Sequence, residues 1–144
     1  LIPCVDQSRD FVGGFTDDLE AVVDSEMPII VFGDHTRVLK YINFPFARGA
    51  DGTQLIVSKN QSLSQIFLYF SLDSLNLSNY FYARHFKFLK AQNMLIPPHV
   101  LVEQFTSMTH GFMQQVQLLR DTNHRLQQAR DLLLPRLMNG EITL

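Results

Sequence analysis

The chain has very little cysteine and no long hydrophobic run. Its 144 residues include one cysteine, Cys4, which cannot form an internal disulfide, and five histidines without the spacing of a zinc site. We therefore expect a fold that needs neither disulfides nor metal, in a reducing, cytoplasmic setting. The longest apolar runs, such as residues 27–32, are far shorter than the roughly 20 residues that a membrane-spanning helix needs.

The usual signatures of catalysis are also missing from the sequence. It has no glycine-rich phosphate loop, no pair of histidines four apart, no serine elbow and no activated cysteine. The acidic residues Asp17, Asp18 and Glu20 would suit a divalent metal in a nuclease, but they are more typical of a solvated acidic turn. The sequence therefore predicts a non-catalytic protein without a cofactor or metal of its own.

Net positive charge is absent too, although the charges are unevenly distributed. Twelve basic and fourteen acidic residues give a net charge of −2, which argues against non-specific coating of nucleic acid. Residues 1–26 contain seven acids and one arginine, a charge of −6, and the other 118 residues carry +4. This distribution remains compatible with DNA recognition, and it predicts weak binding when the chain is alone.

What the sequence does contain is a strand-rich first part. Short runs of Ile, Val, Phe and Tyr between glycine, proline and asparagine turns predict strands near 28–33, 37–42 and 54–58. An apolar stripe at helical spacing predicts a helix over about 62–73, capped by Ser62 or Ser64. Further short strands are expected around 86–88 and 94–96, before Pro97 and Pro98. We expect an α+β fold with a small mixed domain over residues 1–98.

A long helix is predicted from His99 to about Met138. An apolar residue recurs there at every seventh position: Phe105, Phe112, Leu119, Leu126 and Leu133. A second row of Leu101, Met108, Val116, Ala129 and Leu137 is interrupted by polar residues. Such a pattern is typical of a coiled coil, and a helix of this length spans roughly 55–60 Å. We therefore predict that residues 99–144 form a helix and tail that pair with another helix; a surface helix of the same domain is the alternative.

Basic and aromatic residues alternate in residues 80–90, which contain no acid. In an extended conformation, Arg84 and Lys90 would share one face and His85 and Lys87 the other. Such a segment suits either DNA contacts or an edge strand protected by its charges. Other basic residues flank the loops 33–36 and 49–52 and would extend the surface. The candidate DNA-binding residues are Arg37, Lys40, Arg48, Arg84, His85, Lys87 and Lys90.

Taken in order along the chain, several motifs resemble the specificity subunit of type I restriction-modification enzymes. The motifs are IVFGDHT at 30–36, FPF at 44–46, GADGT at 49–53, YARHFKFLK at 82–90, IPP at 96–98, EQF at 103–105 and RDLLLPRLMNGEI at 130–142. The first four are similar to parts of a target recognition domain, and the others are similar to the helical conserved region. The resemblance extends over nearly the whole chain.

The resemblance implies a non-catalytic subunit of a prokaryotic defence complex. Such a subunit reads a split site on double-stranded DNA with two recognition domains, held apart by two antiparallel helices. It docks methyltransferase subunits and, through them, restriction subunits; S-adenosylmethionine, ATP and Mg²⁺ would belong to those partners. This chain resembles the carboxy-terminal half, so its helix would pair with the rest of the subunit or with a second copy.

The sequence allows alternatives for the extent of the protein and for its function class. Leu1 in place of a methionine predicts a piece of a longer protein, although a natural half-length subunit is the alternative. A coiled-coil scaffold without DNA reading is the second function class, because the seven-residue row predicts it equally well. An enzyme acting alone is a third and weaker hypothesis.

Overall fold

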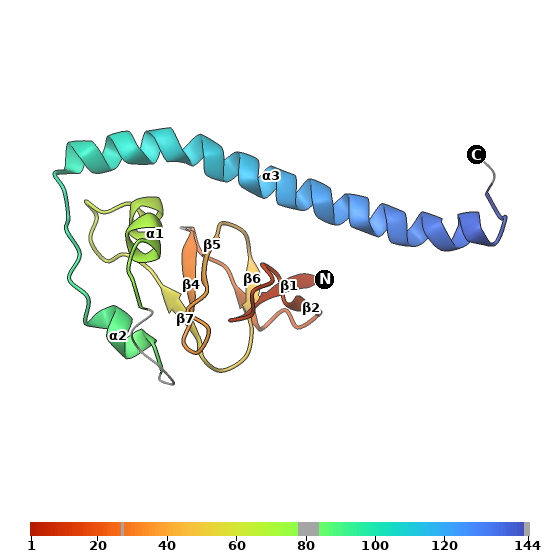
Figure 1. Ribbon diagram of the computed structural model, residues 1–144, viewed down its shortest axis with the longest axis horizontal. Helices are drawn as coiled ribbons and strands as arrows, with labels where there is room; N and C mark the ends of the chain where they lie inside the picture. The colour runs from red at the N-terminus through yellow and green to blue at the C-terminus, as the bar shows by residue number, and fades with distance from the viewer. Residues whose placement is uncertain (27, 78–83, 143–144) are drawn as a thin grey trace. The chain divides into compact units, whose positions relative to one another are not determined.

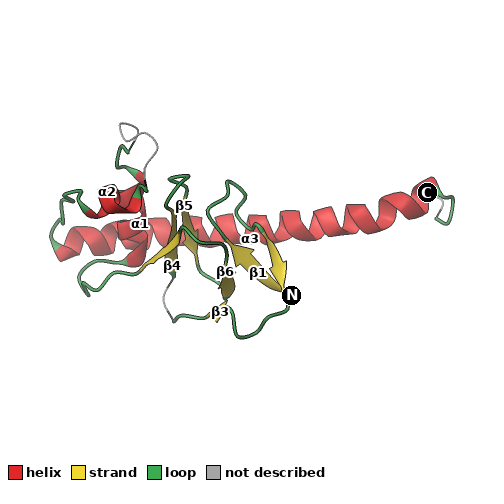
Figure 2. Ribbon diagram, turned by 90° about the horizontal axis from the view of Figure 1, so that it is seen from below, coloured by secondary structure: helices red, strands yellow, loops and turns green. Residues whose placement is uncertain are grey.

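The computed structural model describes residues 1–26, 28–77 and 84–142 and shows an α+β fold (Figures 1 and 2). Seven strands precede three helices in these residues. The strands are β1 (Ile2–Val5), β2 (Gly14–Thr16), β3 (Val22–Val23), β4 (Ile29–Gly33), β5 (Leu39–Ile42), β6 (Phe46–Arg48) and β7 (Thr53–Ile56). The helices are α1 (Gln65–Asp73), α2 (Phe86–Lys90) and α3 (His99–Met138).

The strands form two small sheets. One has the order β2-β1-β6-β3, in which β1 and β6 are parallel and the other pairs antiparallel. The other has the order β5-β4-β7 and is antiparallel throughout. In this second sheet Gly33 of β4 lies opposite Thr53 of β7, so the loops that follow β4 and precede β7 meet at the same edge.

The core lies on both faces of β4, all five residues of which are buried. Ile29 and Val31 pack with Val5 and Phe46 from the first sheet. Because side chains alternate along a strand, Phe32 points the other way and packs with Leu77 and with Leu89 of α2. Burial on both faces explains the unbroken apolar run of this strand.

The strand and helix predictions are confirmed for the middle of the domain. Strands β4, β5 and β7 lie within or beside the three predicted ranges, and α1 falls inside residues 62–73. Ser64 caps α1, since its hydroxyl accepts a hydrogen bond from the backbone N–H of Phe67 at 3.2 Å. The four strands of the first sheet were not predicted, because three of them have only two or three residues and β1 contains a proline, which is unusual within a strand.

The two later strand predictions are wrong. Residues 86–88 belong to the helix α2, and residues 94–96 form no regular element. The aromatic and β-branched composition of these segments favours strands locally, but tertiary contacts decide their conformation. The part of the predicted basic segment at 80–83 lies outside the described residues.

The long helix is confirmed with its predicted limits, since α3 begins at His99 and ends at Met138. Its 40 residues correspond to about 60 Å. The chain forms two compact units, residues 1–106 and 107–144. The first two turns of α3 belong to the first unit, where Val102 is buried and the hydroxyls of Thr106 and Ser64 lie 2.6 Å apart.

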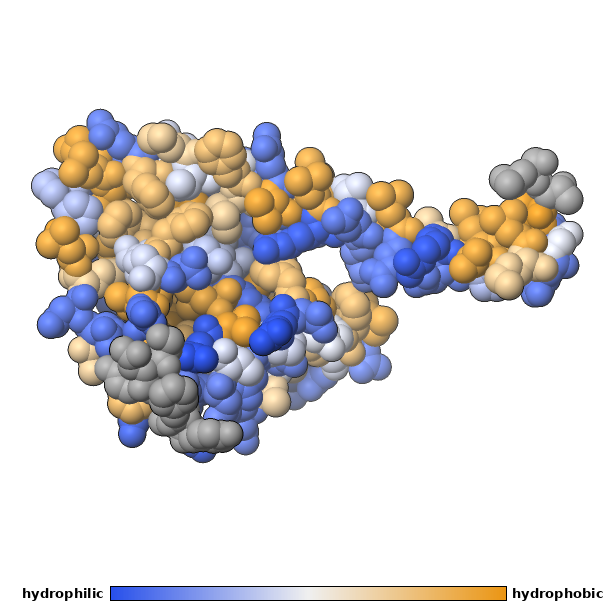
Figure 3. Space-filling view, viewed as in Figure 1, coloured by the Kyte–Doolittle hydropathy of each residue, from blue (hydrophilic) through white to orange (hydrophobic). Residues whose placement is uncertain are grey.

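The predicted apolar row therefore has two different parts. Phe105 packs edge-to-face on Phe67 and Phe70 of α1, with ring centroids 5.5 and 5.6 Å away, so it is half-buried against the first unit. Phe112, Leu119, Leu126 and Leu133 are exposed. Exposed Leu132, Leu134 and Met138 add to the apolar surface near the end of α3, which Figure 3 shows. Of the described helices, none is both long enough and apolar enough to cross a membrane.

Candidate nucleic-acid interface

The turn between β4 and β5 is the centre of the candidate site. The N–H of Gly33 donates to the carbonyl of Val38, and the N–H of Arg37 donates to the carbonyl of Gly33, both at 2.8 Å. Arg37 has a φ of 63°, an unusual conformation for a residue with a side chain. A Cβ at Gly33 would clash with the hydroxyl of Thr36 and with the Cβ of Gln7. The turn therefore requires glycine at its first position.

Asp34 joins this turn to two distant segments. Its N–H donates to the carbonyl of Gly52 in the β6–β7 loop, and its own carbonyl accepts from the N–H of His85, both at 2.8 Å. Its carboxylate accepts from the N–H of Phe86, the first residue of α2, also at 2.8 Å. Asp34 is 4% exposed, and it serves as the N-terminal cap that α2 lacks locally.

Gln7 is a second connecting residue, which the sequence did not indicate. Its amide oxygen accepts from the N–H of His35 at 3.1 Å, and its amide nitrogen donates to the carbonyl of Asp51 at 3.2 Å. Its backbone carbonyl accepts from the hydroxyl of Thr36 at 2.6 Å. A lone glutamine carries no recognisable spacing, so no local signal distinguishes it. Gln7 therefore joins the β4–β5 turn to the β6–β7 loop.

The predicted residues Arg84, Lys87 and Lys90 are exposed. Because α2 is helical, Lys87 and Lys90 are three residues apart and share a face, which corrects the alternating faces expected of a strand. The ammonium groups lie over Phe88 and Phe86, 4.7 and 5.0 Å from the ring centroids. These contacts hold the two lysine side chains against the aromatic rings while the ammonium groups stay at the surface.

The predicted residue Lys40 lies in the interior. It is 3% exposed, its Nζ donates to the carbonyl of Asp10 at 2.5 Å, and it pairs with the Asp6 carboxylate at 3.7 Å. Burial lowers the pKa of Lys40, and Asp6 and Asp10 oppose that shift. The expectation that Lys40 extends a basic surface is corrected: it connects β5 to the segment after β1.

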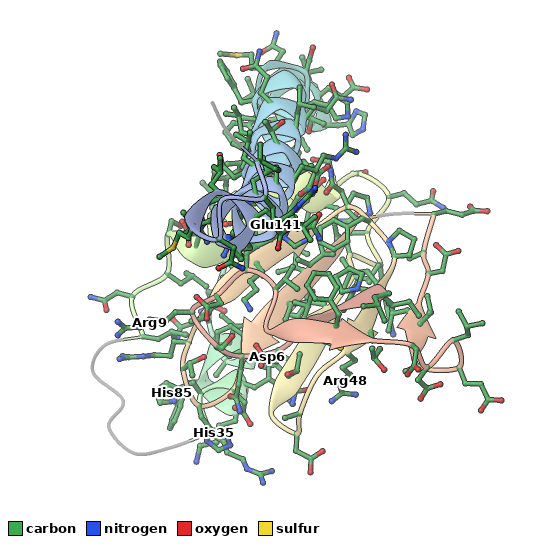
Figure 4. The ribbon with its side chains drawn as sticks, turned by 90° about the vertical axis from the view of Figure 1, so that its right-hand side faces the viewer. Asp6, Arg9, His35, Arg48, His85 and Glu141 are labelled. Carbon is green, nitrogen blue, oxygen red and sulfur yellow. The ribbon has the colours of Figure 1, made fainter. Side chains whose placement is uncertain are left out.

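His85 is also buried, with 5% of its surface exposed. Burial lowers its pKa, as do the Arg37 cation and His35, while Asp34 acts in the opposite direction. Figure 4 shows His35 and His85 close to each other. His85 packs against the turn, where its N–H donates to the carbonyl of Asp34, so it is corrected from a surface contact to a packed residue.

The remaining predicted cations are exposed. Arg37 lies in the turn, where its guanidinium donates to the carbonyl of Leu77 at 3.1 Å, and Arg48 ends β6 just before the β6–β7 loop. Because Asp34 bonds to His85 and Phe86, the turn that contains Arg37 lies next to the start of α2. The exposed candidate residues are thus Arg37, Arg48, Arg84, Lys87 and Lys90.

The acidic residues near the start of the chain form an ordinary turn. The Asp18 carboxylate accepts from the N–H of Glu20 at 3.0 Å, and Asp17, Asp18 and Glu20 are exposed. Within residues 1–26, 28–77 and 84–142, no three His, Cys, Asp or Glu side chains come together as a metal site would require.

Comparison with known proteins gives no match: no family model, no curated protein and no solved structure is similar to this chain.

Proposed function

We propose that this chain recognises duplex DNA sequence-specifically as the carboxy-terminal half of a type I specificity subunit. The observation that carries the proposal is the convergence at Asp34, which places Arg37 of the turn beside the start of α2 and its exposed cations. Cations of this kind hold phosphates, and rigid loops next to them are suited to read bases. The ordered motifs described above support the same assignment.

The long helix supports the proposed architecture. After Phe105, the row of Phe112, Leu119, Leu126 and Leu133 is exposed along α3. A seven-residue apolar row is stabilised by a partner helix, which in this proposal comes from the rest of the subunit or from a second copy. About 60 Å exceeds one turn of DNA, about 34 Å, so two recognition domains would reach separate half-sites.

In this proposal, the chemistry belongs to other subunits. The chain docks methyltransferase subunits, which bind S-adenosylmethionine, and restriction subunits, which use ATP and Mg²⁺, act through them. The site described above uses its charged groups for binding and support: Asp34 caps a helix and Lys40 is paired in the interior. We propose a cytoplasmic DNA-binding subunit without catalytic activity of its own.

A coiled-coil scaffold is the second candidate function, and the exposed row on α3 favours it. The two candidates differ in what they expect of DNA. A scaffold uses the row and is indifferent to sequence, whereas a reader enriches particular duplexes.

Selection from a randomised duplex pool at about 50 mM salt tests the proposal, because low salt strengthens weak phosphate contacts. We expect the full chain to enrich one short sequence. The triple variant R84A/K87A/K90A should weaken binding to every duplex and lower the salt slope by about 2 to 3, the loss of roughly 0.9 per phosphate contact.

The matched control is Lys59→Ala, which removes an exposed cation between β7 and α1 that is not among the candidates. Its affinity should match that of the unmodified chain. A pool that yields no enriched sequence would favour the scaffold and contradict DNA recognition.

A further inference from the structure

We infer that His35 and Asp51 are the side chains that read base edges, and that Gln7 is the residue that positions both. The inference rests on the proposed function and assigns phosphate contacts and base contacts to different residues. The cations of α2 hold phosphates, and the two loops held by Gln7 determine which sequence is bound.

The first step is the difference in how the exposed side chains are supported. Lys87 and Lys90 have long, flexible stems, which suit contacts to phosphates that are the same in every sequence. His35 and Asp51 have short side chains on loops whose backbones are fixed by the amide of Gln7 at 3.1 and 3.2 Å. Reading base edges requires donors and acceptors in fixed places, and these loops provide them.

The second step is the close approach of the two loops. Gly52 follows Asp51 and has a φ of +92°, a conformation that favours glycine. A Cβ at Gly52 would lie 3.0 Å from the ring carbon Cδ2 of His35 and 3.0 Å from the amide nitrogen of Gln7. The absence of a side chain at this position lets the His35 ring lie against the β6–β7 loop, next to the residue that follows Asp51.

The third step is chemistry. Both side chains are exposed, and the imidazole offers a donor and an acceptor. A carboxylate is repelled by phosphate, but it accepts a hydrogen bond from the amino group of cytosine in the major groove. Asp51 therefore suits a base edge and excludes the phosphate backbone, which is a useful property at a site that determines specificity.

The experiment uses the duplex enriched by the unmodified chain and a scrambled duplex of the same composition. His35→Ala and Asp51→Ala should each lower the preference for the enriched duplex roughly tenfold to hundredfold, while affinity for the scrambled duplex does not fall. Lys87→Ala should show the opposite pattern, with both duplexes weakened alike. Exposed substitutions of this kind leave the core intact, and thermal unfolding checks this.

Two variants of Gln7 test its positioning role. Gln7→Ala removes the hydrogen bonds to the His35 N–H and to the Asp51 carbonyl. It should reduce the preference for the enriched duplex as much as the substitutions of His35 and Asp51 together. Gln7→Glu keeps an acceptor for His35 but places an oxygen against the Asp51 carbonyl. It should therefore lose the preference only at the base position that Asp51→Ala affects, a pattern that general loosening of the fold would not produce.

The outcomes separate the inference from the proposal on which it rests. If the unmodified chain enriches a sequence and both His35→Ala and Asp51→Ala keep the full preference for it, the inference is overturned and DNA recognition stands. If the unmodified chain enriches nothing, DNA recognition itself fails and the inference fails with it.

Discussion

Lys40 shows how a single charged residue can serve the interior of this domain. It lies in β5 of one sheet, and its ammonium group binds the carbonyl of Asp10 and the carboxylate of Asp6 in the connection between β1 and β2 of the other. The hydrogen bonds from Ser8, followed by Lys40, lower the pKa of Asp6. The residue thus connects two small sheets that share little main-chain pairing.

Removal of the Lys40 side chain tests this structural role. Lys40→Ala should lower the free energy of unfolding by about 1–3 kcal/mol, because it leaves a gap and an unpaired carbonyl. Lys40→Met fills most of the gap but leaves the same carbonyl of Asp10 unpaired, so it should cost less than Lys40→Ala without being neutral. Urea unfolding measures both, and DNA affinity of Lys40→Met should equal that of the unmodified chain. A loss of affinity in this folded variant would return Lys40 to the binding surface.

His85 predicts a particular pH dependence of stability. Burial, with Arg37, lowers its pKa in the folded chain below the value of about 6.5 in the unfolded chain. The unfolded state therefore binds more protons between these two values, and stability rises with pH there. Its contribution is fully present above about pH 6.5 and is lost as the pH falls through the folded-state pKa.

The measurement is the urea midpoint between about pH 7.5 and about pH 5.5. The unmodified chain should lose more stability over this interval than His85→Gln, which cannot take up a proton. If the urea midpoint changes equally with pH in the unmodified chain and in His85→Gln, His85 does not cause the pH dependence of stability.

At the scale of the element, α2 depends on a residue far away in the sequence. Its five residues are too few for a stable helix in isolation. The Asp34 carboxylate binds the N–H of Phe86, and Leu89 packs on Phe32 and Leu77. Both supports come from outside the helix.

Substitution of Asp34 removes the cap of α2. Asp34→Ala should lower the free energy of unfolding by about 0.5–2 kcal/mol and speed hydrogen exchange of the α2 amides. Asp34→Asn retains the carboxamide oxygen as an acceptor and is the matched control. Similar exchange in Asp34→Ala and the unmodified chain would show that α2 needs no cap from the turn.

These dependences explain which parts of the fold were predictable. Strand β4 and helix α1 are specified by patterns within their own residues, and α3 follows two prolines and a regular apolar row. Helix α2 is specified by a carboxylate 52 residues earlier, so its aromatic composition indicated a strand. The candidate site divides in the same way: charge identified Arg84 and Lys87, but burial of Lys40 and His85 and the role of Gln7 depend on long-range contacts.

At the scale of the whole molecule, α3 carries a row of exposed apolar side chains beyond the first unit. Phe112 is 68% exposed, and Leu119 and Leu126 are 62% and 63% exposed. Large apolar side chains in such a row are rarely left in water. In the proposed function, they contact a second helix.

Charge placed in the row tests this contact. The purified chain should form dimers, and the double variant Leu119→Arg with Leu126→Arg should be monomeric by analytical ultracentrifugation. Its thermal midpoint for the unit of residues 1–106 should not change, because these side chains lie outside that core. Gln128→Arg adds charge at an exposed polar position on another face and should leave the dimer intact. Dimers in the double variant would contradict a seam at these residues.

The link between Asp34 and α2 also has a consequence for the order of folding. The first hydrogen bond of α2 closes a loop of 52 residues, and such closures are entropically costly until the intervening segments are ordered. We therefore expect the β4–β5 hairpin to form before α2. A newly made chain should then form α2 after its sheets, so that in the proposed function the cations that contact DNA take their places only on sheets that are already folded.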